Sequence, residues 1–277
     1  MSMKKLLHIE QIKILNYNPF RITLALYFIF FTLGIVIYPL MDREIPVVSI
    51  SDIFRFPDVW YFFTWITEPY NALLAIIIIM ITSKEFANHT FKTQVIFGMS
   101  RTELLLQRLL SIVILSLFAT LLVGVSSMIM GLIYSYKITF KIAMENTWIL
   151  SKYFLAAFSY MTFGLLFALM IKNTAMAILS FLALRMFVEP VIFLILKDYE
   201  VKWYLPFRTI SRLTPVPDLI QIFERRMNTG EPVDVNGSSF ELLPQGLPLW
   251  LNILMVVLYV TLMIFFCYRL IQRRRLT

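Results

Sequence analysis

The chain has 277 residues, of which 59% are hydrophobic and only 15% are charged. Soluble globular domains carry about 25% charged residues and fewer apolar ones, so the composition excludes an ordinary soluble protein. The formal net charge of +8 is typical of basic flanks on the cytoplasmic side of a membrane protein, which we favour over a nucleic-acid-binding surface.

The apolar residues form long uninterrupted runs, which indicates an all-α integral membrane protein. A spanning helix needs about 20 mainly apolar residues. By that measure the sequence predicts six transmembrane spans, at residues 21–40, 60–82, 109–135, 151–171, 175–196 and 248–268. Little sequence is left for a soluble part, so we expect one transmembrane domain over residues 1–277.

The first residues predict an amphipathic helix within residues 1–20. Apolar side chains recur at helical spacing over residues 3–18, and lysines occupy the other face. Such a helix lies in the plane of the membrane interface. Pro19, preceded by Asn18, ends it, and the first predicted span follows at once.

Lysine and arginine near the span ends predict the orientation. They gather in the N-terminal flank, in the loop 83–108, at Lys172 and in the C-terminal tail, whereas the first loop on the other side holds more acidic than basic residues. We therefore expect both termini in the cytoplasm, with the chain in the inner (cytoplasmic) membrane. An even number of spans, such as six, places both termini on the same side of the membrane.

The segment 83–110 is the most polar region between two long apolar runs. Its charged residues are expected to stay in water or at the membrane surface: Lys84, Glu85, Lys92, Arg101, Glu103 and Arg108. A short amphipathic piece inside it consists of Thr90, Phe91, Val95, Ile96 and Phe97. Gly98 permits a turn, and Ser100 three residues before Glu103 is a capping-box pattern that begins the next helix. The segment is either an interfacial linker or a surface made to touch another protein.

The extracytoplasmic loop 197–247 is the least regular region. Trp203 and Phe207 suggest a segment at the membrane surface, and Thr214 precedes a predicted short helix over residues 215–228. The remainder is rich in turn residues.

No pattern of a known catalytic site is present. The only two histidines, His8 and His89, fall in predicted cytoplasmic segments. There is no HExxH, no GxSxG, no paired metal-ligand cluster and no GxxxxGK[ST] phosphate loop. We therefore expect a chain that is not an enzyme and that binds no cofactor of its own.

Three charged residues lie inside predicted spans, namely Glu68, Arg185 and Glu189. Each costs about 2.5–3.5 kcal/mol near the bilayer centre, so they must face the bundle or water. Arg185 and Glu189 are four residues apart and share a helix face, and all three fall at a similar depth. The cluster either holds the second and fifth helices together or lines a substrate path or outer gate. Proline follows both glutamates, at Pro69 and Pro190, and predicts bends there.

Several short stretches resemble the membrane subunit, or permease, of a type-2 ABC exporter. They are the amphipathic start ending near Pro19, Glu85 with Asn88-His89-Thr90, Gly98-Met99-Ser100-Arg101, and Phe163-Gly164-Leu165-Leu166 through Lys172-Asn173. Six spans with a long outer loop before the last are similar as well. Family members often carry proline near the position of Met99, which this chain lacks.

The resemblance implies a partner-driven transporter. Two permeases, identical or different, would form a pathway in the membrane lipid, and each would carry an ABC ATPase subunit that holds ATP and Mg²⁺. Segment 83–100 would be the coupling helix seated on that ATPase. The implied coupling residues are Glu85, Thr90, Phe91, Val95, Ile96, Phe97 and Arg101, with Lys172 and Asn173 as a minor second contact. The alternatives are a polytopic membrane enzyme, or an ATP-independent transporter or scaffold, that uses the Glu68/Arg185/Glu189 cluster.

Overall fold

The computed structural model describes residues 18–41, 53–87, 90–135, 139–171, 173–217 and 247–273. These residues are almost entirely helical, and they contain no strand. The prediction of an all-α protein is confirmed. The longer helices are α2 (Asn18–Met41), α3 (Val59–Thr67), α4 (Asn71–Ala87), α6 (Arg101–Tyr134), α8 (Ile149–Met170), α9 (Thr174–Ala183) and α13 (Leu249–Arg273). The shorter ones are α5 (Thr90–Ile96), α7 (Phe140–Met144), α10 (Glu189–Ile195) and α11 (Pro206–Ser211).

Five helical segments of the described chain are long and apolar enough to cross a membrane. They are Val59–Phe86, Arg101–Tyr134, Phe140–Met170, Thr174–Ile195 and Leu249–Arg273. Each covers one of the last five predicted spans to within one residue, and most extend beyond it at the other end. The first predicted span falls on α2, a helix of 24 residues. Its side chains are described only over Asn18–Leu33, a stretch that is apolar but shorter than a full crossing. The structure therefore supports a multi-pass membrane protein.

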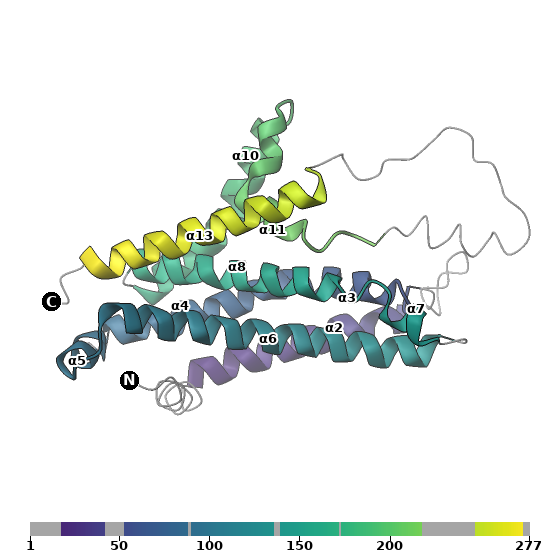
Figure 1. Cartoon of the computed structure of the whole chain (residues 1–277), viewed down its shortest axis with the longest axis horizontal. Coiled ribbons are helices and arrows are strands. Elements are labelled where there is room, and N and C mark those ends of the chain that lie inside the picture. The colour runs from purple at the N-terminus through teal and green to yellow at the C-terminus, as the bar shows by residue number, and fades with distance from the viewer. Residues whose placement is uncertain are drawn as a thin grey trace, which may run out of the picture.

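Helix α8 lies at the centre of the bundle and packs against α4, α6 and α13 (Figure 1). The closest approach is between α8 and α4. A Cβ atom added at Gly164 would lie 2.7 Å from the carbonyl oxygen of Ala75, so only glycine fits there. The side chains of Tyr153 and Tyr160 are also buried on α8. This helix therefore forms the core against which the other spans are arranged.

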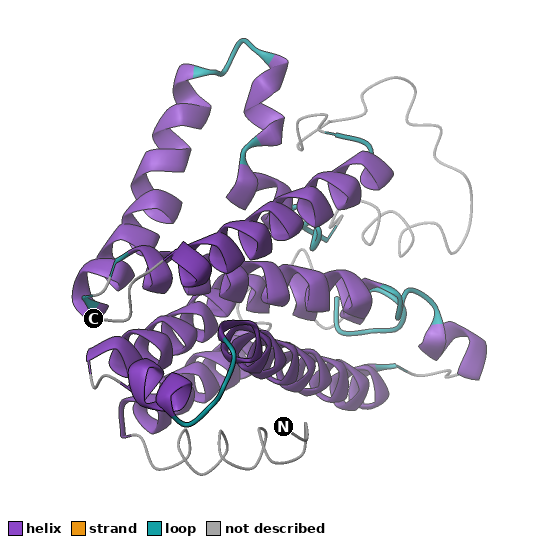
Figure 2. Ribbon diagram, turned by 60° about the vertical axis from the view of Figure 1, so that its left-hand side comes forward, coloured by secondary structure: helices purple, strands orange, loops and turns teal. Residues whose placement is uncertain are grey.

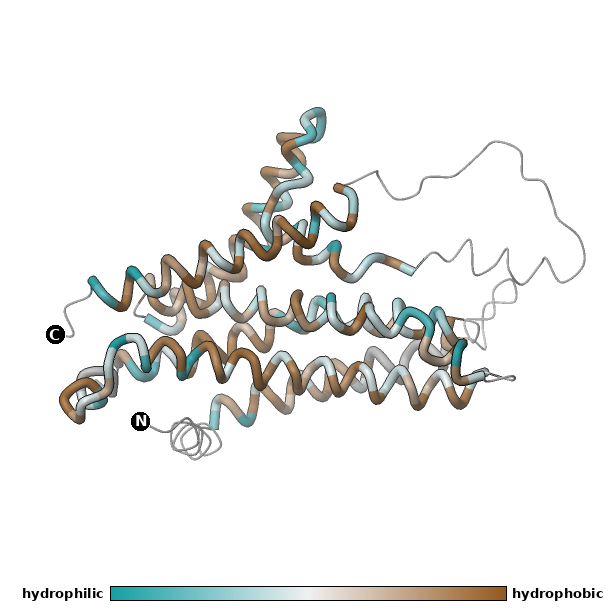
Figure 3. The backbone as a smooth tube through the Cα atoms, viewed as in Figure 1, coloured by the Kyte–Doolittle hydropathy of each residue, from teal (hydrophilic) through white to brown (hydrophobic). Residues whose placement is uncertain are grey.

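The outer faces of the bundle are apolar rather than polar. The tube in Figure 3 is brown along much of the long helices, as their hydropathy requires. Leu121 on α6, Leu179 on α9 and Trp250 on α13 are each more than 60% exposed. Apolar side chains exposed in such numbers indicate a lipid-facing surface, because a soluble protein does not expose large contiguous apolar patches.

One helical segment begins against the bundle, where α9 packs on α8 and α4, and then projects from it. The segment Thr174–Ile195 runs outward and turns at residues 196–199 (Figure 2). The chain returns through η4 (Glu200–Tyr204) and α11, which packs on α13 and α8. This return places Thr209 of α11 against the first turn of α13, where Asn252 donates to its carbonyl oxygen.

Both predicted proline bends coincide with a break in the α-helical hydrogen-bond pattern. Pro69 lies in the 3-10 turn η2 (Glu68–Tyr70), which separates α3 from α4. Pro190 follows the π turn η3 (Leu184–Val188), in which Glu189 N donates to the carbonyl of Leu184. Proline supplies no N–H and displaces the preceding turn, which accounts for both irregularities.

Three predictions fall outside the described residues. They are the interfacial helix at residues 3–18, most of the outer helix at 215–228, and the contact at Lys172.

Candidate functional site

Helix α5 lies at one end of the bundle, in the connection between α4 and α6 (Figure 1). Gly98 follows it with a φ of +89°, a left-handed conformation that favours glycine. Ser100 then begins α6 with a complete capping box, because its side chain accepts from Glu103 N and the Glu103 carboxylate accepts from Ser100 N at 2.8 Å. A short helix, a turn at Gly98 and a capped helix start therefore follow one another in this part of the chain.

The apolar side chains at the end of α5 point into open space. Ile96 is 73% exposed and Phe97 is 84% exposed. Val95 is half-buried. For Thr90 and Phe91 the structure describes the helical backbone and not the side chains. An exposed isoleucine and phenylalanine side by side form an apolar contact surface at the tip of the molecule.

Two charges predicted to stay in water are instead buried beneath α5. Glu85 on α4 and Arg108 on α6 are each 2% exposed and form an ion pair. The prediction failed because the ends of α4 and α6 lie side by side, so the two opposite charges neutralise each other inside the protein. Glu85 therefore contacts its own bundle rather than a partner, and it joins the two helices that flank α5.

Arg101 and Asn173 also have defined structural partners. Arg101 Nη1 donates to the carbonyl oxygens of Ile271, at 3.2 Å, and Gln272, which links the start of α6 to the end of α13. Asn173 caps α9, since its side-chain oxygen accepts from Ala175 N and Met176 N. Arg101 therefore joins α6 to α13, and Asn173 fixes the start of α9.

The predicted intramembrane cluster is present in part. Glu68 accepts a hydrogen bond from the Tyr160 hydroxyl, and its carboxylate lies 3.5 Å from Arg185 Nη2. Arg185 also donates to the carbonyl of Pro69 at 3.1 Å, and its guanidinium lies over the Tyr160 ring. Glu68 and Arg185 therefore contact each other between the membrane-spanning segments Val59–Phe86 and Thr174–Ile195.

Glu189 makes its hydrogen bonds to α11. Its carboxylate accepts from Phe207 N at 3.0 Å and from Arg208 N at 2.6 Å. These are first-turn N–H groups of α11, whose N-cap residue, Leu205, has no side-chain oxygen to cap them. A carboxylate near a helix N-terminus satisfies these donors and complements the dipole.

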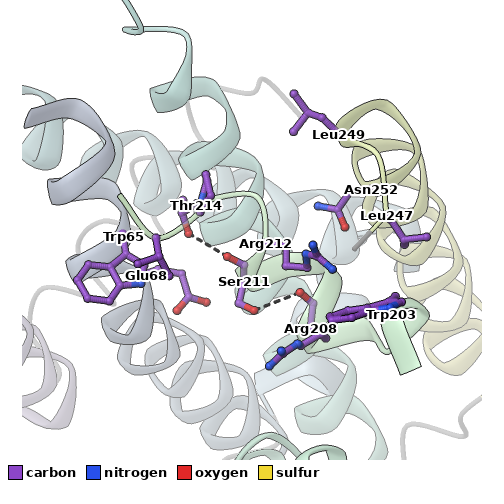
Figure 4. Close-up of a pocket in the computed structure, with 12 residues that line it drawn as sticks. Trp65, Glu68, Trp203, Arg208, Ser211, Arg212, Thr214, Leu247, Leu249 and Asn252 are labelled. Carbon is purple, nitrogen blue, oxygen red and sulfur yellow. Dashed lines mark hydrogen bonds between the residues drawn. The ribbon is translucent and has the colours of Figure 1, made fainter. Parts of the chain in front are cut away.

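Two cavities surround α11, and Arg208 and Ser211 line both of them. One, of about 350 Å³, is also lined by Glu68, Trp203, Arg212 and Asn252 (Figure 4). The other, of about 370 Å³, is also lined by Tyr160, Arg185, Glu189 and Phe193. Both cavities therefore combine aromatic walls with charged groups.

The sequence analysis missed Arg208 and Arg212. They lie four residues apart in the outer loop, a spacing that puts two residues on one helix face, but they were considered only as charges of a long loop. The Arg212 guanidinium lies 4.6 Å from the centre of the Trp203 ring, and that of Arg208 lies 4.2 Å from the Phe193 ring. Burial lowers the pKa of Arg212, and the neighbouring charge of Arg208 lowers it further.

The described residues contain no group of three or more His, Cys, Asp or Glu side chains that could hold a metal ion. The sequence matches no protein-family model, and no curated protein matches it either.

Proposed function

We propose that this chain is the membrane subunit of an ATP-driven ABC exporter, with six spans and both termini in the cytoplasm. In this proposal α5 is the coupling helix that docks on a separate ATPase subunit. The observation that carries it is the pair of exposed apolar side chains, Ile96 and Phe97, at the tip of the bundle. The sequence resemblance described above supports it independently.

The contacts around α5 suit the transmission of force. The capping box fixes the start of α6, the Glu85–Arg108 pair ties α6 to α4, and Arg101 ties α6 to α13. A push on α5 would therefore move several spans as one body, as a rigid-body change between inward- and outward-facing states requires. The ATP and Mg²⁺ would reside on the partner.

The arrangement of the helix ends supports the proposed topology. The start of α2, helix α5 and the end of α13 lie at the same end of the molecule, and α7 lies at the other (Figure 1). If α2 crosses the membrane with the other five segments, residues 18 and 273 fall on one side. The exposed apolar faces of Thr174–Ile195 and α13 leave room for lipid and for a second permease.

The alternative functions require the intramembrane cluster to be reactive. Glu68 is bonded to Tyr160 and Arg185, and Glu189 is bonded to the backbone of α11. Both carboxylates therefore already stabilise helix contacts, and no observation favours a membrane enzyme or an ATP-independent transporter over the permease.

The test is recovery of an ATPase with the tagged full-length protein from its native membranes. We expect mass spectrometry to identify an ABC ATPase with the wild type. Ile96→Glu and Phe97→Glu should reduce its recovery about tenfold or more, because a buried charge at a docking surface is costly. Phe140→Glu is the matched control, since Phe140 is 77% exposed on α7, at the opposite end.

Loss of the ATPase with the α5 variants and its retention with Phe140→Glu would support the docking role. Equal recovery with all three variants, or no ATPase with the wild type, would contradict it. Each variant must also reach the membrane in wild-type amounts, which immunoblotting of the membrane fraction measures.

A further inference from the structure

The outer cavities hold more positive than negative charge. Their linings include the guanidinium groups of Arg185, Arg208 and Arg212, against the carboxylates of Glu68 and Glu189. The two carboxylates are bonded as described above, and Arg185 is paired with Glu68. Among the described residues, Arg208 and Arg212 form no ion pair.

Both of these arginines also have a buried donor atom without a partner. Arg208 Nε and Arg212 Nη1 are inaccessible to solvent and donate to no acceptor within the described part of the chain. A buried donor left unbonded costs about 1–3 kcal/mol, and more when the group is charged. Two neighbouring guanidinium groups also repel each other, so an anion between them would relieve both costs.

One acceptor at the same cavity is unbonded as well. The Asn252 side chain donates through Nδ2 to the carbonyl of Thr209 at 3.0 Å, but its buried Oδ1 has no donor among the described residues. Figure 4 shows Asn252 on α13 near Arg212, which lies over Trp203. The cavity thus presents cationic donors on one side and an acceptor for a hydroxyl group on another.

One side of the cavity lies at the depth of lipid head groups. Leu249, the first residue of α13, lines it together with Glu68. Glu68 lies nine residues inside the span Val59–Phe86, about 14 Å from its end, whereas Leu249 lies at the end of its own span, at the level of the lipid head groups. A phosphate group of a lipid in that leaflet lies at the same level as Leu249.

We infer that the cavity beside α11 binds a phosphate-bearing ligand, with Arg208 and Arg212 holding the phosphate and Asn252 accepting from a neighbouring hydroxyl. Glycerophosphate, the head group of an anionic phospholipid, carries both features. A free phosphate ester offers the same chemistry, so the source must be decided by experiment. The inference does not depend on the proposed ATPase partner.

The test uses the purified full-length protein in a neutral detergent with three soluble probes. The probes are short-chain phosphatidylglycerol, glycerol 3-phosphate and inorganic phosphate, each titrated while the melting temperature and tryptophan fluorescence are measured. Trp65 and Trp203 line the cavity and report on its occupancy. We expect saturable binding of phosphatidylglycerol by the wild type.

Arg208→Gln and Arg212→Gln should each weaken that binding about tenfold or more, since each removes a charge-assisted contact. Arg212→Lys should recover part of the affinity, because it restores the charge without the planar fork. The matched control is Arg269→Gln, which removes an arginine that also stacks on an aromatic ring, Phe265, but near the other end of α13. It should leave the affinity unchanged.

The outcomes separate the possibilities. Tighter binding of phosphatidylglycerol than of glycerol 3-phosphate supports a lipid ligand, and equal binding supports a soluble phosphate ester at the same site. The inference is overturned if no probe binds to the wild type. It is also overturned if the glutamine variants have the wild-type affinity and, without ligand, the wild-type melting temperature. In either case the cavity holds water only. Recovery of the ATPase with Arg212→Gln would show that the two proposals stand or fall separately.

Discussion

A glutamate–arginine ion pair lies near each end of α4, and the two pairs have different surroundings. At the α5 end, Glu85 and Arg108 are both buried and bonded to each other. At the other end, Glu68 pairs with Arg185, which is only half-buried and lines a cavity. The buried Glu85–Arg108 pair links two helices. The Glu68–Arg185 pair lies at the wall of cavities that also hold other arginines, so the site has positive charge left to bind a ligand.

The surroundings follow from the neighbouring elements. At the α5 end, the ends of α4 and α6 lie close together, and the capped start of α6 covers the pair. At the other end, α11 enters between the spans and brings Arg208 and Arg212 with it. The α5 end of α4 is therefore suited to transmit force, and the end beside α11 is suited to bind a ligand.

The largest expected effect comes from breaking the buried pair. Arg108→Leu should lower the free energy of unfolding by about 3–5 kcal/mol, because it leaves the Glu85 carboxylate buried without its partner. Thermal and denaturant unfolding of the purified protein in detergent measures the change.

The double variant Glu85→Leu/Arg108→Leu should recover most of that loss, since it removes both charges. Lys84→Gln, at the exposed neighbour of Glu85, should stay within about 0.5 kcal/mol of the wild type. A single Arg108→Leu variant as stable as the wild type would show that the pair does not link α4 to α6.

A smaller effect should come from the close contact between α8 and α4, the helix that has an ion pair near each end. Gly164→Ala should destabilise the protein by about 1–3 kcal/mol, because the new Cβ atom would overlap the backbone of α4. Gly124→Ala is the control, since its Cβ would meet only the flexible Leu150 side chain, at 3.2 Å. Equal melting temperatures for the two variants would contradict the close packing of α8 on α4.

The smallest effect should come from the pair at the cavity. Arg185→Ala should lower stability, and adding Glu68→Gln should partly relieve the loss. The coupling energy of a double-mutant cycle should be about 1 kcal/mol, below that of the buried pair, because Arg185 is half-buried and 3.5 Å from Glu68. Additive effects of the two substitutions would rule out the pairing.

Much of the fold could be predicted from local patterns. The apolar runs placed the long helices, and the Ser100 and Glu103 spacing predicted the start of α6 to the residue. The prolines after Glu68 and Glu189 predicted where the helices become irregular. These features depend on residues only a few positions apart, so the sequence alone carries them.

The polar contacts between helices were harder to predict. Composition placed Glu85 and Arg108 in water, and that prediction was wrong because two helix ends lie side by side. Spacing put Arg185 and Glu189 on one helix face, but it carried no information on the hydrogen-bond donors of Glu189, which come from the backbone of α11.

The sequence by itself determined that the chain is helical, apolar enough for a membrane, and interrupted by a polar loop with a capped helix start. Periodicity, capping and proline act within a turn or two of helix, and they do not depend on the neighbours. Only the tertiary structure decided which carboxylate meets which arginine and that Arg208 and Arg212 face cavities. A charged side chain in an apolar bundle takes the nearest compensating group, and which group is nearest depends on how the helices pack.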